Sequence, residues 1–105
     1  MSLFTKKQLE MMPDLNSQGV GKESLQVYLV VVLGNFCWLL TEYDKKNEVF
    51  LCFACLNDPK MAELGYISKT ELEHLKLKFS FHLDVYDVYK DNITLKEAKR
   101  KYIGI

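Results

Sequence analysis

A run of nine residues, Leu25–Leu33, constrains the fold of this chain more than any other segment. The run is rich in β-branched side chains, alternates partly between polar and apolar residues at its start, and is wholly apolar from Leu29 onward. β-Branched side chains favour extended backbone, and a strand that is apolar on both sides needs cover on both faces. We therefore predict a strand that lies centrally in a sheet.

Two further strands are predicted directly after this run. Phe36–Tyr43 and Glu48–Leu56 are apolar and aromatic, and four polar residues between them have the composition of a turn. This pattern predicts an antiparallel hairpin, so that the first half of the chain supplies a three-stranded meander. On the first strand of the hairpin, Trp38 is expected to be buried together with Phe36 and Leu40.

Three segments carry the signal of a helix start. In a capping box, two side chains three residues apart satisfy backbone N–H groups that the first helical turn leaves free. The chain has this spacing at Thr5 and Gln8, at Ser68 and Glu71, and at Thr94 and Glu97. We expect a first helix that ends at Pro13, a second from Lys69 to about Leu75, and a third that opens at Thr94.

The segment after the second predicted helix alternates strictly between polar and apolar residues from Lys76 to Leu83. Such alternation predicts a half-exposed strand, which Leu83–Tyr89 continues or follows after a bend. Strands bracketed by short helices indicate an α+β fold. The prediction is a single domain over residues 1–105, with a mainly antiparallel sheet of four to five strands and about three short helices.

The overall charge narrows the classes of function. Fourteen basic and fourteen acidic residues give a formal net charge of zero, which disfavours both a globally basic nucleic-acid binder and an acidic protein that imitates DNA. No export signal is visible, and the longest apolar run is far shorter than the roughly 20 residues that cross a bilayer. Three cysteines cannot form a complete disulfide framework. We expect free thiols, a cytoplasmic protein and no membrane partner.

The cysteines and histidines do not form a recognisable site. Cys52 and Cys55 have the spacing of a metal or redox pair, but side chains three apart on a strand point to opposite faces, and structural zinc needs four ligands. His74 and His82 lie eight residues apart, with no nucleophile pattern beside either. We therefore predict no metal and no cofactor.

The carboxylates and glycines are equally uninformative about catalysis. Asp84 and Asp87 would point to opposite faces of one strand. A meeting of Asp84 with Glu42 across strands, which would suit a hydrolase or nuclease, stays open as a distant alternative. Gly19 and Gly21 form a Gly-x-Gly pair, but the rest of a phosphate-binding loop is absent. We predict no catalytic residues, no small-molecule substrate and no enzymatic activity.

The carboxy-terminal segment is basic. Lys96, Lys99, Arg100 and Lys101 stand there against a single acidic residue, Glu97. These side chains could contact phosphates, which would make the chain a nucleic-acid-binding accessory protein. They could equally form the solvated face of an amphipathic helix, with the lysines near its end complementing the helix dipole.

Two motifs resemble those of a known family. The segment Trp38–Asp44 ends in Thr-Glu-Tyr-Asp, and Glu63–Ser68 reads Glu-Leu-Gly-Tyr-Ile-Ser and is followed by Glu71-Leu72-Glu73. This pair is similar to a bacterial family of unknown function whose small members are carried on plasmids, conjugative elements and phages. The resemblance covers roughly residues 3 to 98. The chain departs from the family's pattern at Leu51-Cys52, where a Gly is usual, and near Asp84, where an Arg-Asp pair is not clearly present.

The resemblance implies a function that the residues alone do not show. One branch of the family is associated with inhibition of type II CRISPR nucleases. By this resemblance the chain would be a non-enzymatic binding protein of a mobile genetic element, with Cas9 or its guide complex as its protein partner. The motif positions carried over as possible interaction residues are Glu42, Asp44, Glu63, Tyr66 and Glu71.

Overall fold

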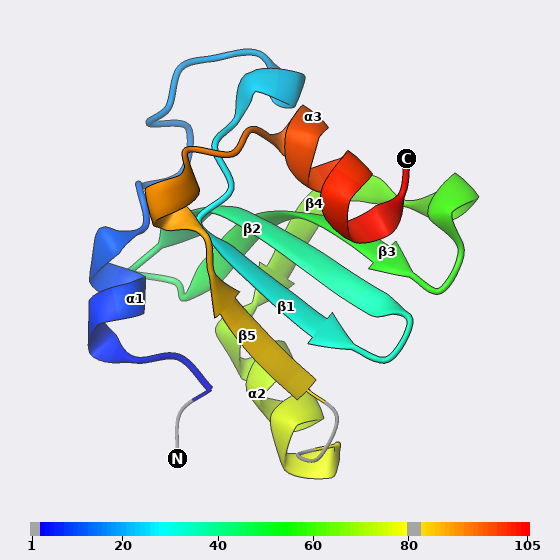
Figure 1. Cartoon of the computed structure of the whole chain (residues 1–105). Coiled ribbons are helices and arrows are strands. Elements are labelled where there is room, and N and C mark those ends of the chain that lie inside the picture. Colours follow the sequence, from blue (N-terminus) through cyan, green and yellow to red (C-terminus); the bar gives the residue numbers. More distant parts are fainter. Residues whose placement is uncertain (1–2, 80–82) are drawn as a thin grey trace.

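The computed structural model describes residues 3–79 and 83–105 and has one five-stranded antiparallel sheet (Figure 1). The strand order across the sheet is β4-β3-β2-β1-β5. The strands are β1 (Leu29–Leu33), β2 (Phe36–Asp44), β3 (Val49–Leu56), β4 (Glu63–Ser68) and β5 (Leu83–Asp87). The helices are α1 (Lys6–Met11), α2 (Lys69–Lys78) and α3 (Leu95–Ala98), and α3 continues into the wider turns of η4 (Lys99–Ile103). The predicted α+β class is confirmed.

The central position predicted for the Leu25–Leu33 run is confirmed, because β1 has a neighbouring strand on each side. The strand itself is shorter than predicted and begins at Leu29. Before it, the Val27 N–H donates to the Ile93 carbonyl at 2.9 Å and Gln26 forms an isolated bridge with Thr94. This first part of the run therefore joins the sheet to the segment that leads into α3.

The sheet is covered on both faces, as a wholly apolar strand requires. Leu29 and Val31 of β1 face a core that includes Phe4, Leu72 and residues packed from α1 and α2. Val30 faces a second core on the opposite side, where Leu95 and Ala98 of α3 are fully buried. Figure 1 shows α3 and η4 over one face of the sheet, with α2 beyond the other. The two cores make three layers with the sheet in the middle.

The predicted burial of Trp38 is confirmed and that of Phe36 is wrong. Trp38 is 3% exposed and packs with Leu40 in the α2-side core. Phe36 lies on the same face but is 37% exposed. It stands at the first position of β2, where the sheet ends and α2 no longer covers it fully. This exposed aromatic side chain becomes part of the candidate site.

Two of the three predicted capping boxes are complete. Thr5 with Gln8 and Thr94 with Glu97 each exchange both hydrogen bonds. At the start of α2, the Glu71 N–H donates to the Ser68 hydroxyl at 3.0 Å, and that hydroxyl donates to the Glu71 carboxylate at 3.2 Å. Ser68 is therefore the N-cap as predicted, while Glu71 binds the capping side chain itself.

The strand predicted over Lys76–Leu83 is wrong at its start, because α2 continues to Lys78 and Phe79 caps it. Residues 80–82, which include His82, lie outside the described residues, and β5 begins at Leu83. The alternation was misleading because Leu77 is 77% exposed and has no core to face. Lys and Leu propagate a helix that has been capped, and Lys76 and Lys78 complement its dipole. Throughout the described part of the chain, no helix has the length and apolarity needed to cross a bilayer.

Candidate functional site

An apolar groove lies between α2 and the end of the sheet at which β2 begins. One part of it has a volume of about 390 Å³ and is lined by the following residues: Phe36, Trp38, Leu56, Ile67, Glu71, His74 and Leu75. The strands supply the floor, and α2 supplies one wall through Glu71, His74 and Leu75. Successive turns of α2 thus present one acidic, one imidazole and one aliphatic side chain to the same hollow.

A second hollow of about 650 Å³ continues the first, because Phe36 and Leu75 line both. It extends past the turn between β1 and β2 toward the end of α2 and the start of β5. Its further lining comes from Leu33, Gly34, Asn35, Asn57, Phe79 and Asp84. We call the two hollows together the α2 groove.

The α2 groove exposes large apolar side chains that a monomeric protein usually buries. Leu56 is 56% exposed, Phe79 is 39% exposed and Phe36 is 37% exposed. These three come from β3, from the cap of α2 and from β2, so only the folded chain brings them together. Contiguous apolar surface of this kind is typical of binding sites, which makes the α2 groove the candidate site.

The polar side chains of the groove are acidic or neutral. Glu71 lies at one end and Asp84 at the other, and both are exposed. His74, also exposed, stands beside Glu71 on the α2 wall. Among the described residues that line the groove there is no lysine or arginine. The groove therefore offers an apolar floor between two carboxylates.

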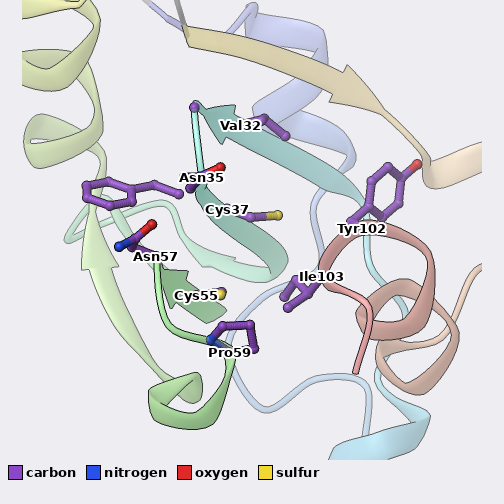
Figure 2. A pocket seen from close by; sticks show the side chains of 10 residues that line it. Val32, Asn35, Cys37, Cys55, Asn57, Pro59, Tyr102 and Ile103 are labelled. Atoms are coloured by element: carbon purple, nitrogen blue, oxygen red, sulfur yellow. The ribbon is translucent and has the colours of Figure 1, made fainter.

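A further hollow of about 290 Å³ lies on the α3 side of the sheet, beneath the end of η4 (Figure 2). At the end of the sheet it shares Gly34, Asn35, Phe36 and Asn57 with the larger part of the α2 groove. Cys37 and Cys55 line it from β2 and β3, and Tyr102 and Ile103 line it from η4. The two cysteines are directly opposite each other in the strand register. Burial, together with the neighbouring Cys55, raises the pKa of the Cys37 thiol to about 11.

Glu42, a residue of the first family motif, is inside the protein. It is 1% exposed, and its carboxylate accepts the backbone N–H of Asn16 at 2.7 Å and that of Gln18 at 3.3 Å. The Gln18 side chain in turn accepts the Gln26 N–H at 2.8 Å and donates to the Thr41 carbonyl at 3.1 Å. Glu42 thus fastens the loop that precedes β1 to the sheet.

The other motif positions are dispersed over the molecule. Asp44 accepts the backbone N–H groups of Lys46 and Asn47 at 3.0 and 3.1 Å in the β2–β3 turn. Glu63 and Tyr66 lie on β4, an edge strand, where Tyr66 is 66% exposed. Of the five motif residues, only Glu71 lines the α2 groove. The structure does not bring these five side chains together.

The basic carboxy-terminal residues are not equally available to contact phosphates. Lys99 forms an ion pair with Glu23, with Nζ and Oε1 2.8 Å apart, and its Nζ lies 4.9 Å from the centre of the Phe53 ring. Lys96, Arg100 and Lys101 are exposed. The side chain of Lys99 therefore ties α3 and η4 to the rest of the molecule, and three cations remain on the surface.

The pairings considered for catalysis are not formed. Asp84 and Glu42 do not meet. Asp84 of β5 lies opposite Val32 of β1, and Val32 lies opposite Cys37, near the start of β2, whereas Glu42 lies near its end. Cys52 faces the α2-side core and Cys55 faces the α3-side core, as the strand geometry predicts. Within residues 3–79 and 83–105, no group of three or more metal-ligating side chains gathers.

The sequence pattern missed the residues that define the α2 groove. Phe36 was assigned to the core, and Leu56, Leu75 and Phe79 were given no role at the surface. The one sequence signal for an exposed groove residue is an apolar side chain at the first or last position of a strand, because the core ends there. Which helix leaves such a side chain uncovered depends on the tertiary arrangement.

Comparisons with family models, with curated proteins and with solved structures gave no significant match to this chain. The resemblance carried by the two motifs therefore stays a prediction.

Proposed function

We propose that this chain is a non-enzymatic binding protein that holds a partner protein in the α2 groove. The observation that carries the proposal is the exposure of Phe36, Leu56 and Phe79 around a continuous hollow, whose floor includes the buried Trp38. Aromatic and aliphatic anchors that fill such pockets supply most of the affinity in protein interfaces. The groove therefore suits a partner segment with large apolar side chains.

The charges of the groove narrow the chemistry of the partner segment. Glu71 and Asp84 stand at its two ends, and the described lining contains no basic side chain. Complementary charge fixes the orientation of a partner and speeds association. We infer a segment whose apolar anchors are flanked by lysine or arginine, so that each basic group meets one carboxylate.

The partner to test is a type II CRISPR nuclease bound to its guide. The motifs that end in Asp44 and begin at Glu63 imply it through their resemblance to a mobile-element family. Such nucleases hold the guide–target duplex in a positively charged channel, so their surfaces offer the basic residues that the ends of the groove would attract. Binding of the chain would then block access of DNA or the movements that precede cleavage.

The experiment measures the affinity of the purified protein for the purified Cas9–guide complex, together with target cleavage. Phe36→Asp removes a groove anchor, and Leu77→Asp adds the same charge on α2 where Leu77 is 77% exposed and outside the groove. We expect Phe36→Asp to weaken binding by about 2 kcal/mol, or about thirty-fold, and to relieve inhibition of cleavage.

The Leu77→Asp control should bind and inhibit like the unaltered protein. Circular dichroism and urea unfolding check that both variants are folded. Equal loss of binding in both variants, or no binding by the unaltered protein, would refute the proposal.

The nucleic-acid alternative has one observation in its favour, the three exposed cations Lys96, Arg100 and Lys101. It is weakened by Lys99, whose charge is already paired with Glu23. A protein that binds nucleic acid through phosphates loses affinity steeply with salt, so the two functions are separable by measurement.

A further inference from the structure

Cys37 and Cys55 form a pair of thiols that no proposed function of the chain uses. They stand opposite each other on β2 and β3, and their side chains are 6% and 4% exposed. Figure 2 shows both sulfur atoms on the wall of the hollow beneath Tyr102 and Ile103. Two soft ligands therefore face one small space from adjacent strands.

The strand geometry sets the separation of the two cysteines. The Leu40 carbonyl accepts the Tyr28 N–H, so the backbone polar groups of Leu40 point away from β3. Backbone N–H and C=O groups of successive residues point alternately to the two neighbouring strands. Cys37 lies three residues before Leu40, so its backbone groups point toward β3. Cys37 and Cys55 therefore form the wider, hydrogen-bonded kind of antiparallel pair, with Cα atoms about 5.5 Å apart.

A pair of this width is poorly suited to a disulfide. A disulfide needs Cβ atoms about 3.5–4.5 Å apart, while directly opposite residues have Cβ atoms about 4.5–5.5 Å apart, with the wider value in hydrogen-bonded pairs. A metal–thiolate bond is about 2.3 Å long, so two such bonds in line separate the sulfurs by about 4.6 Å. Side chains of directly opposite residues project to the same face, so sulfurs that project in parallel keep about the Cβ separation, which matches that distance.

We propose that Cys37 and Cys55 bind a single soft monovalent metal ion of the copper(I) class, held in line between two thiolates. Soft thiolate ligands select copper(I), and a filled d shell with one positive charge is satisfied by two such ligands. Zinc would need four ligands, and among the described residues no third ligating side chain joins the pair. The presence of two ligands therefore favours copper(I) over zinc.

The binding step needs no oxidant or reductant. Each thiol releases its proton to solvent, two metal–sulfur bonds form, and the ion keeps its single positive charge. The site then carries one net negative charge.

The test is an anaerobic titration of the full chain with copper(I) against a chromophoric copper(I) chelator. The unaltered protein should withdraw one equivalent from the chelator, and X-ray absorption should show two sulfur neighbours. Cys37→Ser and Cys55→Ser should each lose this binding. Cys52→Ser is the matched control, because Cys52 is buried in the opposite core and should leave binding unchanged.

Three results would overturn the inference. One is failure of the unaltered protein to compete with the chelator. Another is undiminished binding by Cys37→Ser or Cys55→Ser while these variants remain folded by circular dichroism. The third is loss of binding in folded Cys52→Ser, since that would place the ion elsewhere.

Discussion

The ring of Phe36 meets the ring of Trp38 edge-on, with an interplanar angle of 87° and ring centroids 6.2 Å apart. Both side chains line the α2 groove, but Trp38 is buried in the α2-side core, whereas Phe36 is exposed. The contact holds the exposed ring of Phe36 against the buried ring of Trp38. A partner that docks on Phe36 therefore meets a side chain whose ordering cost was met when the protein folded. This contact suits Phe36 to the role of binding anchor that we propose.

The two faces of α2 should differ sharply in their effect on stability. Leu72 is fully buried and Leu77 is 77% exposed on the same helix. We expect Leu72→Ala to lower the free energy of unfolding by about 3 kcal/mol through the cavity it leaves. Leu77→Ala should change it by less than about 0.5 kcal/mol. Urea unfolding followed by circular dichroism measures both, and equal losses would mean that α2 is oriented differently.

The Glu42 carboxylate should stabilise the fold. In Glu42→Gln, an amide NH₂ replaces one oxygen that accepts a backbone N–H from the loop at Asn16 and Gln18. Hydrogen bonds to charged groups contribute about 1.5–3 kcal/mol each, so we expect a loss of about 2 kcal/mol in urea unfolding. Glu63→Gln, at an exposed position of β4, is the control and should be neutral. A neutral Glu42→Gln would show that the loop holds without this carboxylate.

Glu42 and Asp44 belong to the same sequence motif but have different surroundings in the fold. Both residues follow Trp38 on a single strand, and the family resemblance gave both as possible interaction residues. Both follow the register shift between Leu40 and Glu42, but Glu42 lies within β2, whereas Asp44 is the last residue of the strand. Glu42 then lies under the loop before β1, and Asp44 begins the turn.

Acid should weaken the turn that Asp44 organises. The hydrogen bond from the Asn47 side chain, with the backbone N–H groups of Asn47 and Lys46, lowers the pKa of the Asp44 carboxyl below its ordinary value of 3.8. Because the folded-state pKa is the lower one, this stabilisation is fully present above pH 3.8 and is lost as the pH falls through the folded-state pKa.

Urea midpoints measured from neutral pH into this acid range should therefore fall less in Asp44→Asn than in the unaltered protein. Identical pH profiles for the two proteins would contradict the role assigned to the turn.

Charge reversal on the carboxy-terminal helix separates the two candidate functions. Lys96→Glu with Arg100→Glu leaves the Lys99–Glu23 ion pair intact. We expect this double variant to bind the Cas9–guide complex as the unaltered protein does, because neither residue lines the α2 groove. The nucleic-acid alternative predicts instead that the unaltered protein binds duplex DNA, and that added salt and the double variant both weaken that binding. Titrations at low and moderate salt decide between them.

Most of the secondary structure followed from local chemistry, because capping side chains and β-branched runs act over a few residues. Thr5 and Thr94 start helices where their spacing predicts. The sequence did not predict which side chains lie opposite each other on neighbouring strands, because that depends on the register of strand pairing. Without the bulge in β2, Cys37 would lie opposite Leu56 instead of Cys55. No residue pattern in the hairpin marks that one-residue shift, so the thiol pair was invisible to sequence reasoning.

The central claim is that a partner protein occupies the α2 groove. Its most direct test is methyl NMR of the labelled protein as the purified Cas9–guide complex is added. We predict that the signals of Leu56, Ile67 and Leu75 shift or broaden, while those of Leu77 on the opposite side of α2 and Ile105 at the carboxyl terminus do not change. Changes confined to Leu77 or Ile105, with the groove methyls unaffected, would contradict the account.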